Sequence, residues 1–155
     1  MKATGHSIRV THPKMGFSAA HFVVSGDECE ALHGHNYQVE AVVSGGLDDG
    51  GMVMDFRNLK DEVARACHEL DHRVLLPAKS HSIQINAVES SVKVVVDARE
   101  YVFPGQDCVM LPIEATTAEL LAEHLAKQIH LRRGLQVTLC VSESAGSSGC
   151  YYMET

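Results

Sequence analysis

Three histidines near the start of the chain have the residue type and spacing of a metal site. His33 and His35 form a His-Gly-His triplet, and His21 lies upstream. On an extended strand, side chains two residues apart point to the same face, so His33 and His35 present their imidazoles together. Neutral imidazoles suit Zn(II), and three protein ligands leave a fourth position open for water or a substrate. The pattern predicts a catalytic zinc site formed by His21, His33 and His35.

Two acid–base side chains, Cys29 and Glu30, stand just before this triplet, within reach of a group bound to the metal. Histidines two residues apart also occur by chance, and ten histidines in the chain raise that background. The context favours a metal, because Gly34 allows close backbone approach. Residues 36–43 also alternate polar and apolar side chains, as a half-buried strand does.

The composition indicates one globular domain spanning residues 1–155. Its 155 residues are 45% apolar and 21% charged, which is typical of a chain with a single core. A net charge of −7 disfavours nucleic acid and anionic membranes as partners, but permits a small phosphorylated substrate. Five cysteines without a Cys-x-x-Cys pair predict free thiols rather than a disulfide framework. With no apolar run of signal-peptide or membrane-span length, we expect a cytoplasmic protein.

Hydrophobic periodicity predicts an α+β fold. Residues 56–69 form an amphipathic helix with Asp55 as its N-cap, and Thr116 with Glu119 reads as the capping box of a second helix that ends before Gly134. Alternating residues predict a first pair of strands interrupted at Pro13, and further strands later in the chain, over 8–10, 17–24, 33–43, 83–87, 92–96, 101–103 and 135–141. This order predicts an antiparallel sheet with two helices on one face.

Six short motifs occur along the chain in a characteristic order. They are Phe17 to His21, Cys29 to Tyr37, Met54 to Phe56, Leu70 to His72, Pro112 to Glu119, and Val141 to Glu143. Together they resemble the 6-pyruvoyl-tetrahydropterin synthase / 6-carboxytetrahydropterin synthase family. The resemblance implies the tunnelling fold (T-fold), with sheets that join into an oligomeric barrel. It also implies that His21, His33 and His35 bind zinc.

The resemblance implies two further groups of functional residues. Proton transfer on the side chain of a dihydropterin triphosphate falls to Cys29 and to an acid–base pair, Asp71 and His72, in which the carboxylate fixes the imidazole tautomer. Three of the implied residues or pairs also have a purely structural interpretation. Asp71 and His72 could be a turn aspartate and a histidine that complements the helix dipole, Thr116 could be a helix cap, and Glu143 could be a solvated side chain at a strand end. The residues implied to hold the pterin are Glu143, which binds its amino-pyrimidine edge, Thr116 and Thr117.

Two of these residues point to different reactions. The three-residue gap between Cys29 and the triplet resembles the 6-carboxytetrahydropterin synthases of queuosine and archaeosine biosynthesis, and we predict this reaction on 7,8-dihydroneopterin triphosphate. The 6-pyruvoyl-forming members have a longer gap. Glu30 creates a Glu-x-x-His-Gly-His sequence, which resembles members that use glutamate as the base and release 6-hydroxymethyl-dihydropterin for folate synthesis. A chain with both residues is compatible with either reaction, or both.

Alternatives from other classes are a non-catalytic pterin- or metal-binding protein and a zinc hydrolase with Glu30 as its base. The binding protein does not explain Cys29, Asp71 and His72. The hydrolase does not explain the Asp71–His72 pair or Glu143. The resemblance also implies a homo-oligomer, a hexamer built as a dimer of trimers, in which neighbouring chains share the pocket. One departure is the segment 79–112, which looks longer than in compact relatives.

Overall fold

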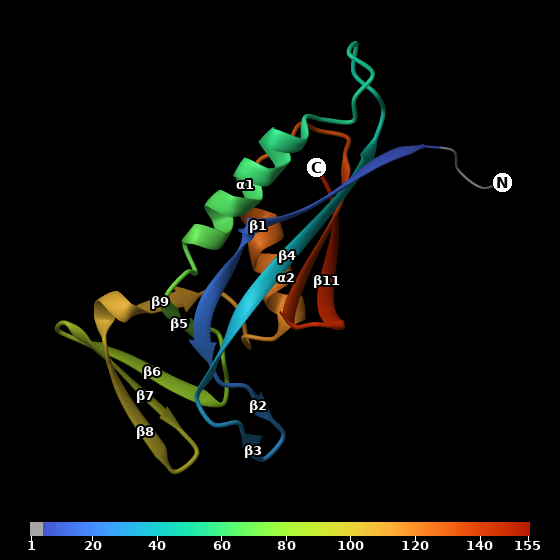
Figure 1. The fold of residues 1–155 in the computed structure, drawn as a ribbon. Coiled ribbons are helices and arrows are strands. Elements are labelled where there is room, and N and C mark those ends of the chain that lie inside the picture. Colours follow the sequence, from blue (N-terminus) through green and yellow to red (C-terminus); the bar gives the residue numbers. More distant parts are fainter. Residues whose placement is uncertain (1–4) are drawn as a thin grey trace.

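The computed structural model describes residues 5–155 and is built around a six-stranded sheet (Figure 1). The strand order is β11-β10-β4-β1-β5-β9. The predicted antiparallel arrangement is confirmed for β11, β10, β4 and β1, whereas β5 and β9 join the edge in parallel. The strands are β1 (His6–His21), β4 (His33–Gly45), β5 (Arg73–Pro77), β9 (Cys108–Leu111), β10 (Gln136–Ser144) and β11 (Ser147–Glu154).

The first strand is continuous, so the predicted pair of strands broken at Pro13 is wrong. β1 pairs with β4 along both halves, and the register shifts between Thr11 and Gly16. The shift absorbs Pro13, because a proline that cannot donate to the ladder is tolerated at a bulge. The C-terminal half of β1 then runs straight to His21, opposite the start of β4.

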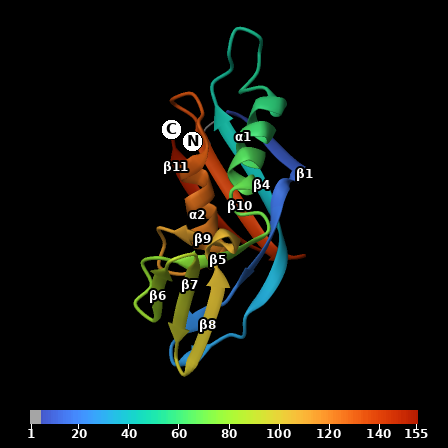
Figure 2. The same cartoon turned by 90° about the vertical axis from the view of Figure 1, so that its left-hand side faces the viewer.

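Two helices, α1 (Phe56–His68) and α2 (Ala118–Gln128), cover one face of the sheet, as predicted (Figures 1 and 2). The Asp55 side chain caps α1 by accepting a hydrogen bond from the backbone N–H of Arg57. The predicted capping box of α2 is wrong by one residue, because Thr117 is its N-cap and accepts from the backbone N–H of Leu120. The core between sheet and helices is closed by large buried side chains, among them Met15, Tyr37, Leu59, Leu121, Leu125 and Leu139.

The segment 79–112 builds a second, three-stranded sheet at one end of the molecule (Figure 2). Its strands are β6 (Ile83–Val88), β7 (Ser91–Val96) and β8 (Arg99–Pro104), and a 3₁₀ turn (Gly105–Asp107) leads to β9. Two-residue turns join the strands, with Glu89 and Asp97 in the left-handed conformation that such hairpins require. A separate apolar cluster packs on this sheet; its buried members are Phe22, Leu76, Ile83, Val92, Val94 and Val96.

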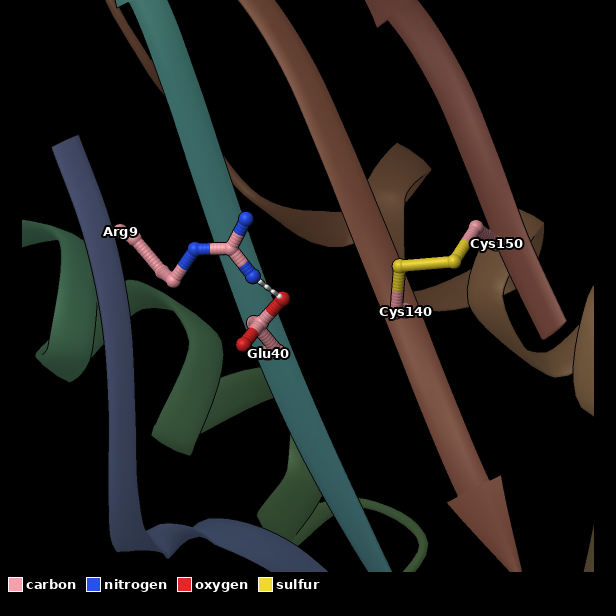
Figure 3. Close-up of a disulfide and its surroundings, with 4 residues drawn as sticks. All are labelled: Arg9, Glu40, Cys140 and Cys150. Carbon is pink, nitrogen blue, oxygen red and sulfur yellow. Dashed lines mark hydrogen bonds and ion pairs between the residues drawn. A yellow bond between two sulfur atoms is a disulfide. The ribbon is translucent and has the colours of Figure 1, made fainter. Parts of the chain in front are cut away.

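A disulfide joins the last two strands, so the prediction of free thiols is wrong for Cys140 and Cys150 (Figure 3). The register of β10 and β11 places these cysteines directly opposite each other. On the neighbouring strands, Arg9 and Glu40 form an ion pair between β1 and β4. Among residues 5–155, no helix is long and apolar enough to cross a membrane.

Candidate metal centre and pocket

The three predicted histidine ligands come together where β1 ends and β4 begins. His21 is paired with His33 across the two strands, and His35 lies two residues further along β4 on the same face. One ring nitrogen from each histidine lies within 4.8 Å of the corresponding nitrogens of the other two. The strand register therefore brings together the residues that the His-x-His spacing predicted.

Hydrogen bonds orient two of the imidazoles. Nδ1 of His21 lies 3.0 Å from the Thr116 carbonyl oxygen and 3.2 Å from the Thr116 hydroxyl, and Nδ1 of His33 lies 2.7 Å from the Ala31 carbonyl oxygen. A carbonyl only accepts, so Nδ1 carries the proton in both rings. Nε2 then carries a free lone pair, which is the arrangement that second-shell carbonyls impose on metal-binding histidines.

Unsatisfied buried atoms show that these residues fit a metal ion. Within residues 5–155, three buried side-chain atoms have no hydrogen-bond partner: Nε2 of His21, Nε2 of His35 and the hydroxyl of Tyr37. Burial lowers the pKa of His21, opposed by the Thr116 hydrogen bond and by Glu143, so the neutral ring is favoured. A cation among the three Nε2 atoms would satisfy the orphaned nitrogens, and an all-imidazole donor set suits Zn(II).

Two carboxylates face the histidine nitrogens. Glu30 Oε2 lies 3.8 Å from Nε2 of His33, and the two oxygens of Glu143 lie 3.8 Å from His21 and 3.9 Å from His35. Both border a cavity of about 460 Å³ between α2 and the β10–β11 hairpin. Its other lining residues are Val23, His33, His35, Thr117, Ala118, Glu119, Ser144, Ser147, Ser148 and Gly149.

Cys29 ends the short strand β3 (Glu28–Cys29), which pairs with β2 (Val24–Ser25), and its thiol does not line this cavity. The side chain packs against the apolar cluster of the second sheet, and Sγ donates to the Glu30 carbonyl at 3.3 Å. Of the two candidate bases that the sequence offers, Glu30 is therefore the one that lines the cavity with His33 and His35.

Asp71 and His72 form a pair at a different place, in the turn between α1 and β5. Asp71 Oδ2 lies 2.9 Å from His72 Nδ1, and Oδ1 accepts from the backbone N–H of Ser18 at 2.8 Å. The Ser18 hydrogen bond, reinforced by His72, lowers the pKa of Asp71. His72 has φ of 57° and an exposed ring, and it borders a cavity that also touches His35.

The two predicted threonines separate into different roles. Thr116 is buried and contacts His21 rather than the cavity, and its hydroxyl also donates to the Phe22 carbonyl at 3.4 Å. Thr117 lines the cavity as well as capping α2. Sequence reasoning missed the part of the cavity wall formed by Ser147 to Gly149, because the small residues there gave no strand pattern.

The sequence profile described as 6-pyruvoyl tetrahydropterin synthase matches residues 11–154. The chain belongs to this family. The putative 6-carboxy-5,6,7,8-tetrahydropterin synthase of Methanocaldococcus jannaschii is 32% identical over 153 residues, covering 92% of this chain and 94% of that protein. The dihydroneopterin monophosphate aldolase of Pyrococcus furiosus is 47% identical over 62 residues, covering 40% of this chain and 53% of that protein.

The solved structures agree with this family membership. Plasmodium vivax 6-pyruvoyltetrahydropterin synthase, in a mutant of a catalytic glutamate, matches with a TM-score of 0.91 and 30% identity over 99% of this chain and 100% of that one. The T-fold and the resemblance to the tetrahydropterin synthases are therefore confirmed, and the chain is a member of a family of pterin-processing enzymes.

Proposed function

We propose that the protein is a zinc-dependent enzyme that acts on the phosphorylated trihydroxypropyl side chain of 7,8-dihydroneopterin and releases 6-hydroxymethyl-7,8-dihydropterin. In this proposal His21, His33 and His35 hold the zinc, Glu30 moves the proton, and Glu143 with Thr117 binds the pterin. The observation that carries it is the position of Glu30, whose carboxylate lies 3.8 Å from Nε2 of His33 on the cavity wall.

Cleavage of the substrate side chain requires a general base beside its C2′ hydroxyl. A carboxylate takes the proton from the C2′ hydroxyl and the C1′–C2′ bond breaks, so that C2′ becomes the aldehyde carbon of a released phosphorylated glycolaldehyde. The electron pair of the broken bond moves into the conjugated ring, and C1′ then takes the proton back from the carboxylic acid. Zinc, when bound, would polarise side-chain oxygens of the substrate as a Lewis acid. The Glu30 carboxylate is 56% exposed, so it remains accessible to a substrate.

Binding of the pterin ring requires a hydrogen-bond acceptor for the N–H groups of its amino-pyrimidine edge. Glu143 is suited to this because a carboxylate accepts two parallel N–H hydrogen bonds. It stands at the end of β10, and the N-terminal turn of α2 forms the wall beside it. This supports an arrangement in which the ring enters between α2 and the β10–β11 hairpin, with its side chain directed toward the histidines.

Formation of 6-carboxytetrahydropterin is the second candidate, with Cys29, Asp71 and His72 moving the protons. Two observations favour it: the presence of Cys29 at the spacing of that group, and similarity to the Methanocaldococcus jannaschii relative over most of both chains. The packing of Cys29 against the second sheet is the reason that it ranks below the Glu30 reaction.

The deciding experiment compares Glu30→Gln and Cys29→Ala in zinc-loaded protein supplied with 7,8-dihydroneopterin triphosphate. We expect Glu30→Gln to lower kcat by about 10²–10⁴-fold, the usual contribution of a general base, and Cys29→Ala to change it little. Glu28→Gln, on the same hairpin but outside the cavity, is the matched control. Full activity in Glu30→Gln with loss in Cys29→Ala would contradict the proposal and support the second candidate.

We also propose that the working protein is a homo-oligomer, a hexamer built from two trimeric rings. Strands β11 and β9 are the edges of the main sheet, and unpaired edges favour association with another chain. Asp71 lies outside the cavity that Glu30 lines, which supports a site completed by a neighbouring subunit. Size-exclusion chromatography with light scattering should give the mass of a hexamer; a fully active monomer would contradict this.

A further inference from the structure

One side chain of the second sheet reaches the loop that carries Glu30. Arg99 is the first residue of β8, immediately after the two-residue turn that joins β7 to β8. One of its terminal nitrogens donates to the Cys29 carbonyl at 2.8 Å, and the other donates to the Glu30 carbonyl at 3.1 Å. A single guanidinium therefore binds two successive carbonyls about 70 residues away in sequence.

Apolar contacts also join the β2–β3 hairpin to the second sheet. Val24, Cys29 and Leu32, which lie in or beside the β2–β3 hairpin, pack against the buried cluster of the second sheet. Figure 1 shows the hairpin and the three-stranded sheet at the same end of the molecule. The second sheet is thus the surface on which the hairpin rests.

The hairpin has little structure of its own. β2 and β3 are two residues each, and beyond their pairing the Glu30 N–H donates to the Val23 carbonyl at 3.0 Å. The Glu30 side chain is more than half exposed, so packing around the carboxylate does not hold it. Its position beside His33 depends on where the backbone of residues 29–30 is held, which is where Arg99 binds.

We propose that Arg99 is a positioning residue: its hydrogen bonds to the Cys29 and Glu30 carbonyls hold the loop so that the Glu30 carboxylate faces the histidine cluster. This inference rests on the proposed function, in which Glu30 is the base. It assigns a role to the segment 79–112, whose sheet supplies both Arg99 and the apolar surface beneath the hairpin. Arginine suits the role because its planar fork donates to two acceptors at fixed geometry.

The test uses Arg99→Met and Arg99→Lys in the full-length, zinc-loaded protein, with Lys93→Met as the matched control. Lys93 lies on β7 and pairs with Glu100 at 3.0 Å, so the control removes a cation from the same sheet without touching the loop. Amide hydrogen exchange is measured for residues 28–32, together with kcat, KM and zinc content.

For Arg99→Met we expect faster exchange at residues 28–32, a kcat lowered about 10- to 100-fold, little change in KM and unchanged zinc content. Arg99→Lys should restore part of the kcat, because an ammonium can bind one carbonyl, and Lys93→Met should resemble the wild type. A structural role alone would lower thermal stability without this selective loss of kcat. Unchanged exchange or unchanged kcat in Arg99→Met would overturn the inference.

The two proposals fail on different variants. If Glu30→Gln is fully active, Glu30 is not the base and the proposed function is contradicted. If Glu30→Gln is inactive while Arg99→Met matches the wild type in exchange and kcat, the base assignment stands and the role of Arg99 is overturned.

Discussion

Nδ1 of His21 lies 3.0 Å from the carbonyl oxygen of Thr116, which stands just ahead of α2. The contact links the metal centre at the end of β1 to the segment that forms the cavity wall. Because it fixes the ring tautomer, the free Nε2 is presented toward His33 and His35 before a metal binds. The same segment therefore shapes the cavity and orients the His21 ring.

Substitutions of Thr116 and Thr117 should separate the orientation of the His21 ring from the capping of α2. Thr116→Val removes a hydroxyl 3.2 Å from His21 Nδ1 and should weaken zinc binding about tenfold. Thr117→Val removes the N-cap of α2 and should lower the free energy of unfolding by about 1 kcal/mol with zinc affinity retained. Chelator competition and urea denaturation measure the two effects. Equal zinc affinity in Thr116→Val and wild type would refute the orienting role of the hydroxyl.

Acid should remove the stabilising contribution of Asp71. The Ser18 N–H and His72 hold the pKa of this carboxyl below its ordinary value of about 3.9, so the unfolded state takes up the proton first as the pH falls. The stability difference between wild type and Asp71→Asn is then complete above about pH 5 and narrows as the pH falls through about 3.9 and below. Denaturation of both proteins from pH 7 to pH 3 measures it. Asp61→Asn, which removes an exposed carboxylate from α1, is the matched control.

Gly149 is required for the approach of β11 to α2. A Cβ at this position would lie 2.4 Å from the backbone nitrogen of Glu119 and 2.7 Å from the carbonyl carbon of Ala118. The backbone of α2 or of β11 must shift to make room, so Gly149→Ala should lower the free energy of unfolding by about 1–3 kcal/mol and distort the cavity. Gly46→Ala, where a Cβ meets nothing within 4 Å, should be nearly neutral. Equal melting temperatures for the two variants would be inconsistent with the close contact.

The disulfide between Cys140 and Cys150 closes a ten-residue loop within the hairpin that carries Glu143. Loop-closure entropy predicts that replacing both cysteines with serine lowers the free energy of unfolding by about 2–3 kcal/mol. Zinc affinity should not change, because neither cysteine is near the histidines in the strand register. Reductant should destabilise the wild type by a similar amount and leave the double variant unaffected; an effect on both would refute the assignment.

Local patterns predicted the parts of the fold that depend on local chemistry. The His-x-His spacing predicted the histidine cluster because strand periodicity alone puts both rings on one face. Asp55 predicted the start of α1 because its cap hydrogen bond is local. Thr116 and Thr117 are both competent caps, so only the tertiary contact with His21 distinguishes them.

Long-range pairing decided what the sequence could not indicate. Strands β5 and β9 are short and take their parallel register from β1, and the disulfide arises from the register of β10 with β11. The bond from Arg99 to the Glu30 carbonyl likewise depends on how the second sheet docks. The cavity beside His33 and His35 is lined by Glu30 and not by Cys29, although both precede the triplet in sequence.

Product identification tests the central claim most directly. Zinc-loaded protein is incubated with 7,8-dihydroneopterin triphosphate, and the pterin formed is identified by mass, with Glu30→Gln and Cys29→Ala in parallel. The Glu30 proposal predicts 6-hydroxymethyl-7,8-dihydropterin from the wild type and Cys29→Ala, and none from Glu30→Gln. Formation of 6-carboxytetrahydropterin that persists in Glu30→Gln and disappears in Cys29→Ala would contradict it.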